Sequence, residues 1–141
     1  MKEYERQSLL DRVNRDGSTV GASIPEHIEV QGDPMSLRRE IWSLRNESHD
    51  TTARRRELTI ALRRERSARL QRLETDAISR ASGVDLAESI IGIDRALEVL
   101  SGIAEDEDIE SEIHRREVAE TERWHAFLTQ ARGEGSKRRH R

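Results

Sequence analysis

The sequence DLAESIIGIDRALEVLSGI, residues 85–103, is the segment around which we expect the chain to fold. Its large aliphatic side chains recur every three or four residues, which is the spacing of one buried helix face. They are Leu86, Ile90, Ile93, Leu97 and Leu100. A second face carries the small residues Ser89, Gly92 and Ala96. A glycine inside a helix costs about 1 kcal/mol relative to alanine, and it is tolerated best where another backbone comes close. We therefore expect this central helix to have neighbours on two sides.

The composition limits the class of protein. Of the 141 residues 38% are charged, 33% are hydrophobic and only 3% are aromatic, which favours one domain with a thin core between helices. The absence of cysteine excludes disulfides, thiolate zinc sites and cysteine nucleophiles. No run approaches the roughly 20 apolar residues of a membrane span, and the charged N-terminus does not resemble a signal peptide. We expect a cytoplasmic protein without a membrane partner.

The net charge of −3 conceals a strong segregation along the chain. Residues 45–82 carry ten basic and six acidic side chains, whereas residues 83–132 carry five basic and thirteen acidic ones. Lys2 and Lys137 are the only lysines among 25 basic residues, which fits either a GC-rich genome or a salt-adapted cytoplasm. A basic helix beside acidic helices is therefore the main electrostatic feature that we expect.

Helical periodicity predicts most of the secondary structure. We expect Gly83 to end the third helix, Asp85 and Glu88 to form a capping box for the fourth, and the acidic run 105–108 to link the fourth to the fifth. The fifth helix has an apolar side made of Ile109, Ile113, Trp124, Phe127, Leu128 and Ala131. The expected helices span residues 3–15, 37–45, about 52–82, 85–101 and 109–131.

One segment, residues 20–37, has the alternation of a strand. Ile28 and Val30 alternate with polar residues, Val20, Ala22 and Ile24 do the same before Pro25, and Gly32 with Asp33 provides a tight turn. These features predict two short strands in a hairpin. The pair Asp33–Pro34 is also typical of a helix start, so that alternative stays open.

These elements predict a mainly α fold with a three-helix C-terminal bundle or helical hairpin. A small N-terminal helix–β-hairpin–helix unit precedes it. We place the N-terminal unit at residues 1–49, the helical bundle at residues 50–132 and a disordered basic tail at residues 133–141.

Two passages carry a resemblance to a known family. They are TVGASIPEHIEVQGDPMSLRREIW, residues 19–42, and ESIIGIDRALEVL, residues 88–100. With the pairs Arg123–Trp124 and Phe127–Leu128, the chain resembles an uncharacterised family of small cytoplasmic haloarchaeal proteins. The resemblance covers nearly the whole chain and implies an archaeal, halophilic setting. It assigns no catalytic or binding residue.

The first candidate site is the arginine-rich helix at residues 54–72. Such a face can neutralise phosphates and release their counterions, and arginine forms paired hydrogen bonds to phosphate. The sequence has no base-reading motif, so binding would not depend on nucleotide sequence. The alternative is a solvated face that pairs with Glu57, Glu65, Glu74 and the acidic helices. The candidate nucleic-acid contacts are Arg55, Arg56, Arg63, Arg64, Arg66, Arg69 and Arg72.

A second candidate site on the same helix is a face for a protein partner. It consists of Leu58, Leu62 and Leu70, which would form an exposed apolar strip if the helix binds another protein or a second copy. On the central helix, we expect Asp94 to form a structural ion pair with the arginine-rich helix.

A metal site has only weak support. Glu122 and His125 have the Glu-x-x-His spacing of di-iron bundles, and Glu110 with His114 is a weaker second pair. Such bundles need two proper pairs and two further glutamates, so we expect no metal ion. Phosphate-binding loops, nucleophile elbows and zincin motifs are absent. We therefore expect no cofactor, no catalytic residue and no small-molecule substrate.

Taken together, the sequence favours a small non-enzymatic interaction or regulatory protein. It would bind a protein partner, or itself as a homodimer, through helix faces. The alternative is a nucleic-acid-associated protein that uses the arginine-rich helix and the basic tail.

Overall fold

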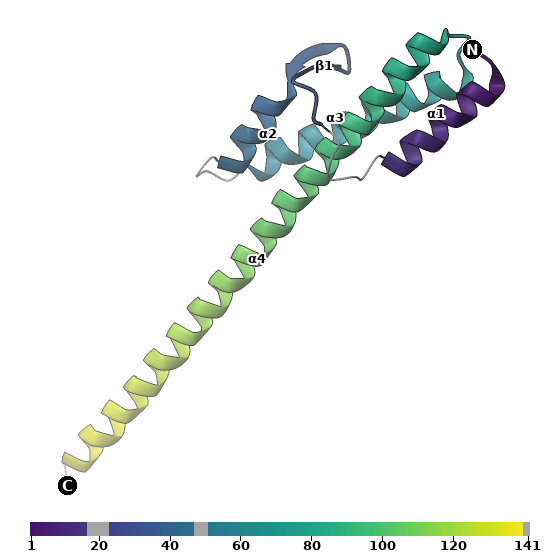
Figure 1. Cartoon of the computed structure of the whole chain (residues 1–141). Coiled ribbons are helices and arrows are strands. Elements are labelled where there is room, and N and C mark those ends of the chain that lie inside the picture. Colours follow the sequence, from purple (N-terminus) through teal and green to yellow (C-terminus); the bar gives the residue numbers. More distant parts are fainter. Residues whose placement is uncertain (17–22, 47–50, 140–141) are drawn as a thin grey trace. The chain divides into compact units, whose positions relative to one another are not determined.

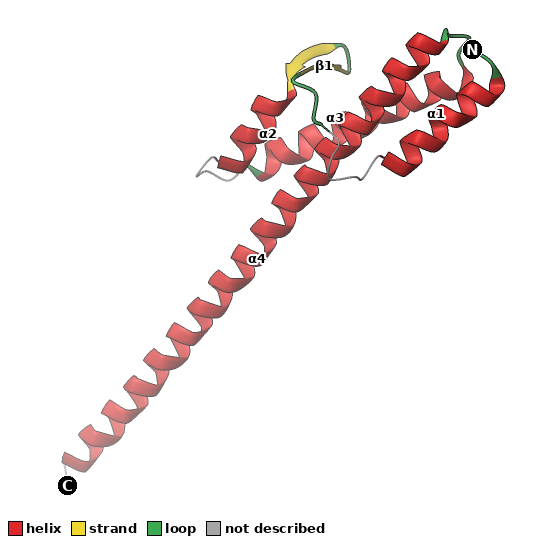
Figure 2. Cartoon of the chain, in the orientation of Figure 1, coloured by secondary structure: helices red, strands yellow, loops and turns green. Residues whose placement is uncertain are grey.

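The structure is a computed structural model that describes residues 1–16, 23–46 and 51–139, with side chains up to residue 132. Helices dominate it, and the chain also forms one small β-hairpin between the first and second helices (Figures 1 and 2). Residues 1–103 and residues 104–141 form two compact units. The predicted mainly α class with an N-terminal helix–hairpin–helix segment is confirmed. The elements are α1 (Glu3–Asp16), β1 (His27–Val30), β2 (Asp33–Ser36), α2 (Leu37–Asn46), α3 (Thr52–Thr75) and α4 (Arg80–Arg139).

The core of the first unit lies along a helical hairpin made of α3 and the first part of α4. At one end, Leu58 and Leu62 of α3 share a cluster with Leu100 and Ile103 of α4, and the β-hairpin and α2 cover it. At the other end, Leu73 packs with residues 86–91 of α4, and α1 covers that cluster. Of the two predicted arrangements, the C-terminal helices therefore form the helical hairpin. The N-terminal residues share these cores with α3 and α4.

The β-hairpin has the predicted type but a different extent. β1 and β2 are antiparallel, Val30 pairs with Asp33, and Ile28 and Val30 are buried. The loop residues Gln31 and Gly32 have φ angles of 52° and 83°, as a type I′ turn requires. Ile24 lies outside both strands, and Val20 and Ala22 lie outside the described residues. Asp33–Pro34 begins a strand, and the helix starts only at Leu37.

Gly92 has the predicted role of a close packing point. A Cβ atom at this position would lie 2.8 Å from Cδ of Pro25 and 3.3 Å from the carbonyl oxygen of Ser23. Real Cβ atoms essentially never lie as close as 2.8 Å to another heavy atom, so glycine allows the segment before β1 to lie against α4.

The predicted boundary between α3 and α4 is wrong. The chain leaves the helix at Asp76, where the guanidinium of Arg6 donates hydrogen bonds to the carbonyl oxygens of Leu73 and Asp76. α4 then starts after Ser79, whose Oγ accepts a hydrogen bond from the backbone N–H of Ser82 at 3.1 Å. This is an N-cap. Gly83 and Asp85 consequently lie inside α4, and Gly83 faces the side chains of Leu9 and Met1.

The predicted break at residues 101–108 is also wrong, because α4 continues through this segment. The segment contains no proline, and an added Cβ at Gly102 would meet no atom within 4 Å, so no contact forces the helix to end there. Backbone helix extends to Arg139, where we expected a disordered tail. Residues 140–141 and the side chains beyond residue 132 lie outside the described part of the chain.

Candidate interaction surfaces

The arginine-rich helix places its guanidinium groups on two different sides of α3. Arg55 is only 9% exposed and is engaged within the protein. Arg66 and Arg69 form ion pairs. By contrast, Arg56, Arg63, Arg64 and Arg72 are exposed, and none of them has an ion-pair partner among the residues that the structure describes. The seven predicted contact residues therefore do not form one surface.

Arg66 and Asp94 join α3 to α4. The Nε atom of Arg66 lies 2.5 Å from Oδ1 of Asp94, and Nη2 lies 3.3 Å from Oδ2, so the guanidinium binds the carboxylate with two nitrogens. Their side chains are 30% and 16% exposed. The predicted structural role of Asp94 is confirmed, and its partner on the arginine-rich helix is Arg66.

Glu65 connects α3 to the turn of the β-hairpin. Its carboxylate accepts hydrogen bonds from Nε of Arg69 at 2.8 Å and from the backbone N–H of Gln31 at 3.0 Å. Nη2 of Arg69 also donates to the carbonyl oxygen of Glu29 at 3.0 Å. Burial alone would raise the pKa of Glu65, but the hydrogen bonds from Arg69 and Gln31 and the charge of Arg69 outweigh it, so this pKa lies below its usual value. Arg69 therefore anchors the hairpin.

Helix geometry explains how the arginines divide. At about 100° per residue, Arg55 and Arg69 lie within about 30° of the direction of the buried leucines of α3. Arg56, Arg63 and Arg64 lie more than about 100° from that direction. We call these three residues the outer arginine face. Ile60, which is 50% exposed, lies among them.

The leucines of the predicted partner face on α3 are not exposed in this structure. Leu58 and Leu62 are 6% and 0% exposed, because they form the core with the hairpin and α4. Leu70 is partly buried against the second core cluster. These leucines hold the first unit together, and they offer no exposed strip to a partner.

An exposed apolar strip lies instead on the part of α4 that belongs to the second unit. Ile109, Ile113, Trp124 and Phe127 are between 49% and 60% exposed, and we call them the α4 stripe. Phe127 follows Ile109 by 18 residues, or about five helical turns, so the two lie on one side of the helix. The rings of Trp124 and Phe127 stack with centroids 5.8 Å apart. The sequence identified this apolar side, but we expected it to be buried in a bundle.

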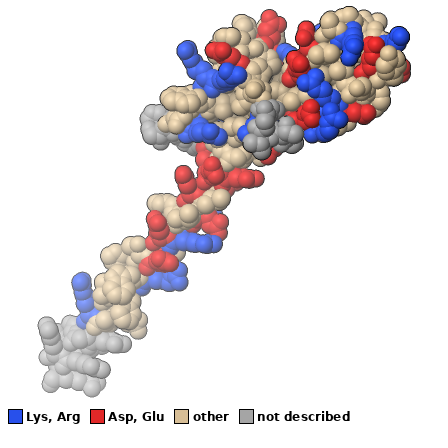
Figure 3. All heavy atoms as spheres, viewed as in Figure 1, with Lys and Arg blue, Asp and Glu red and all other residues tan. Residues whose placement is uncertain are grey.

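Charges surround the α4 stripe unevenly. Residues 105–112 carry six acidic and no basic side chains, and acidic groups dominate the first turns of this segment in Figure 3. Residues 114–132 carry four arginines and three glutamates. Arg116 pairs with Glu112 at 2.7 Å, an (i, i+4) pair that supports the helix.

The predicted weak metal pairs do not come together. Glu110, His114, Glu122 and His125 are all exposed. Among the described residues, no three histidine, aspartate or glutamate side chains are placed to hold a metal ion.

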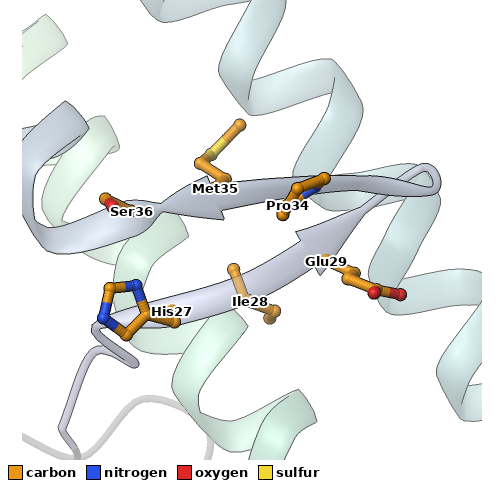
Figure 4. Close-up of a pocket in the computed structure, with 6 residues that line it drawn as sticks. All are labelled: His27, Ile28, Glu29, Pro34, Met35 and Ser36. Carbon is orange, nitrogen blue, oxygen red and sulfur yellow. The ribbon is translucent and has the colours of Figure 1, made fainter.

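One shallow pocket lies on the β-hairpin (Figure 4). Its titratable groups are His27 and Glu29, which lie two residues apart on the exposed face of β1, and Ser36 pairs with His27 across the strands. No hydrogen bond joins any two of these side chains in the described structure. The pocket therefore lacks the coupled nucleophile and base that covalent catalysis requires.

No helix in the described part of the chain combines the length and apolar composition of a membrane span.

Comparison with known proteins gives a family. No curated protein and no solved structure matches the chain. A family described as a family of unknown function, DUF5788, matches residues 1–129, which include both core clusters and the whole α4 stripe. The chain therefore belongs to this family of unknown function, DUF5788.

Proposed function

We propose that this protein is a non-enzymatic interaction or regulatory protein of the cytoplasm, which binds a protein partner or a second copy through a helix face. The α4 stripe carries the proposal. Its four large side chains follow one side of a helix and remain about half exposed. The scarcity of lysine supports the further proposal of a haloarchaeal, salt-rich setting.

The physical reason is that a single helix rarely leaves such a face in water. Most helical stability in proteins comes from packing an amphipathic face, and much less comes from intrinsic propensity. Tryptophan and phenylalanine are enriched at protein interfaces, and tryptophan is prominent among the residues that contribute most to affinity. In the described part of the second unit, α4 is the only helix, so no second helix of this unit covers the α4 stripe there.

Site-specific photo-crosslinking in the native host tests the proposal. A benzoylphenylalanine at position 124 lies within the stripe, whereas one at position 118 replaces Val118, which is 43% exposed on the opposite side of α4. We expect protein adducts from position 124 and at least tenfold fewer from position 118. Equal or absent adducts at both positions would contradict a partner-binding role for this face.

A second candidate function is binding of nucleic acid without sequence specificity. The observation that favours it is the outer arginine face, where three guanidinium groups point away from the core and have no ion-pair partner within the described ranges. Of the predicted contacts, Arg56, Arg63 and Arg64 stay in this proposal, and the exposed Arg72 lies apart from them. Arg55, Arg66 and Arg69 are engaged within the protein.

Titration with duplex DNA and RNA over a range of salt concentrations tests this second function. If the outer arginine face binds phosphates, the double variant Arg63→Gln/Arg64→Gln lowers the slope of log K against log salt by about 2, because each phosphate contact contributes about 0.9. The matched control is Arg39→Gln/Arg45→Gln on α2, which removes the same charge from exposed positions. Equal slopes for both variants, or no binding at low salt, would rule the proposal out.

A further inference from the structure

We infer that the occupant of the α4 stripe is the same stripe of a second copy of this chain, running antiparallel and centred near residue 118. The inference rests on the proposed function and names its partner. Three observations support it: the position of two charges inside the stripe, the charge layout along the helix, and the spacing of the apolar residues.

The first observation is that Arg116 and Glu120 interrupt the stripe near its middle. At about 100° per residue, both lie within about 20° of the direction shared by Ile109 and Phe127. In a parallel pair, Arg116 would face Arg116 and Glu120 would face Glu120, and such like-charge contacts are destabilising. In an antiparallel pair centred at residue 118, Arg116 faces Glu120 of the second copy. The two-fold symmetry of the dimer forms this ion pair twice.

The second observation is the charge layout of the whole segment. Residues 105–112 carry a charge of −6, whereas residues 124–131 carry no Asp, Glu, Lys or Arg. A parallel copy sets the two acidic segments side by side, whereas an antiparallel copy centred at residue 118 places each acidic segment opposite residues 124–131. Like-charge repulsion of this kind disfavours the parallel arrangement.

The third observation is that the apolar residues match across the same centre. Phe127 of the second copy faces Ile109, and Trp124 of the second copy lies opposite Ile113. Each aliphatic end therefore packs on an aromatic end, with Arg116 and Glu120 between them. The present partner of Arg116 is Glu112, in a pair whose side chains are 73% and 63% exposed. Such an exposed pair contributes little stability, so Arg116 exchanges it easily for a partner across the interface.

Sedimentation velocity of the full chain tests the inference. We expect a dimer for the wild type and a monomer for Ile113→Asp and for Trp124→Asp. Val118→Asp is the matched control, because it also adds a charge at an exposed apolar position but on the opposite side of α4, and it should remain a dimer. Circular dichroism of each variant checks that the first unit stays folded. A monomeric wild type overturns the inference, and so does equal dissociation by all three variants.

Charge reversal tests the central contact. Glu120→Arg should raise the dissociation constant of the dimer at least tenfold. The double variant Arg116→Glu/Glu120→Arg should recover most of the lost affinity, since it exchanges the charges on both sides of the interface. Failure of the double variant to restore the dimer would contradict the Arg116–Glu120 contact.

Cysteine cross-linking tests the orientation, and the chain has no cysteine of its own. Oxidation of a mixture of Ile109→Cys and Phe127→Cys chains should give the mixed disulfide dimer, and neither variant should cross-link alone. Cross-linking of each variant with itself indicates a parallel pair and overturns the inference. If the wild type is a monomer but still gives adducts with another protein at position 124, a second copy is ruled out as the occupant of the α4 stripe. The proposed function would then remain intact.

Discussion

Leu62→Ala should reduce the free energy of unfolding of the first unit by about 2–5 kcal/mol, the range for removing a fully buried leucine side chain. Leu62 is 0% exposed and lies between the hairpin, α2 and α4. The surrounding helices are held by their own contacts, so they collapse only partly around the missing methyl groups and a cavity remains. Urea unfolding followed by circular dichroism measures the loss.

The control for Leu62→Ala is Ile60→Ala, two residues earlier on the same helix. Ile60 is 50% exposed, so its truncation should change the free energy of unfolding by no more than about 0.5 kcal/mol. Equal effects of the two variants would mean that Leu62 is not part of the core. A variant of Leu62 that keeps full stability would restore the view of α3 as a docking face.

Glu65→Ala should lower the free energy of unfolding by about 2–3 kcal/mol. The substitution removes the acceptor of charge-assisted hydrogen bonds from Arg69 and leaves the backbone N–H of Gln31 without its partner. The side chains of Glu65 and Arg69 are 15% and 17% exposed, so solvent screens the pair only weakly. Glu57→Ala, at an exposed position of the same helix, should be nearly neutral. A cost of Glu65→Ala no larger than that of Glu57→Ala would show that the carboxylate does not anchor the hairpin.

The pH dependence gives a second test of the same anchor. The pKa of Glu65 in the folded protein lies below its unfolded value, so the carboxylate contributes stability that is fully present above the unfolded pKa of about 4.3. This contribution is lost as the pH falls through the lowered folded pKa. Glu65→Gln does not titrate, so the stability difference between wild type and this variant should shrink from neutral pH to below pH 4. A difference independent of pH would contradict the lowered pKa.

The core of the first unit was predictable because its signals are local. The three- and four-residue spacing of residues 85–103 placed Leu86, Ile90, Ile93 and Leu100 on the buried side, where the structure has them. The glycine in the same helix predicted a close backbone neighbour, and Pro25 occupies that place. Both inferences depend only on residues within one helix.

The end of α3 was not predictable from nearby residues. Carbonyl groups at this end accept hydrogen bonds from Arg6, which lies 67 residues before Leu73, and no local pattern links the two. The start of α4 did have a local signal, since Ser79 is a favoured N-cap type, but Asp85 and Glu88 offered a competing capping box. Tertiary packing decided between them, because Gly83 inside α4 faces Leu9 and Met1 of the N-terminal segment.

The positions of residues around each helix could be predicted for the candidate surfaces, but the exposure of the apolar side could not. Angular position on α3 separates Arg55 and Arg69 from Arg63 and Arg64, and this arithmetic needs only the sequence once the buried side is known. The apolar side of residues 109–131 was equally visible in the sequence. Whether it packs inside the chain depends on a helix break near residue 102, and the sequence there contains no residue that forces one.

The contacts of Arg6 also set an order of events during synthesis. The carbonyl groups that it binds belong to residues made 67 and 70 positions later, and the core over α1 includes residues 84–91. Ile103 completes the other cluster of the first unit. α1 therefore waits, without these partners, until the chain has been made as far as Ile91. Folding of this unit is for that reason a late event, and a ribosome that pauses before residue 103 exposes an incomplete core to chaperones and proteases.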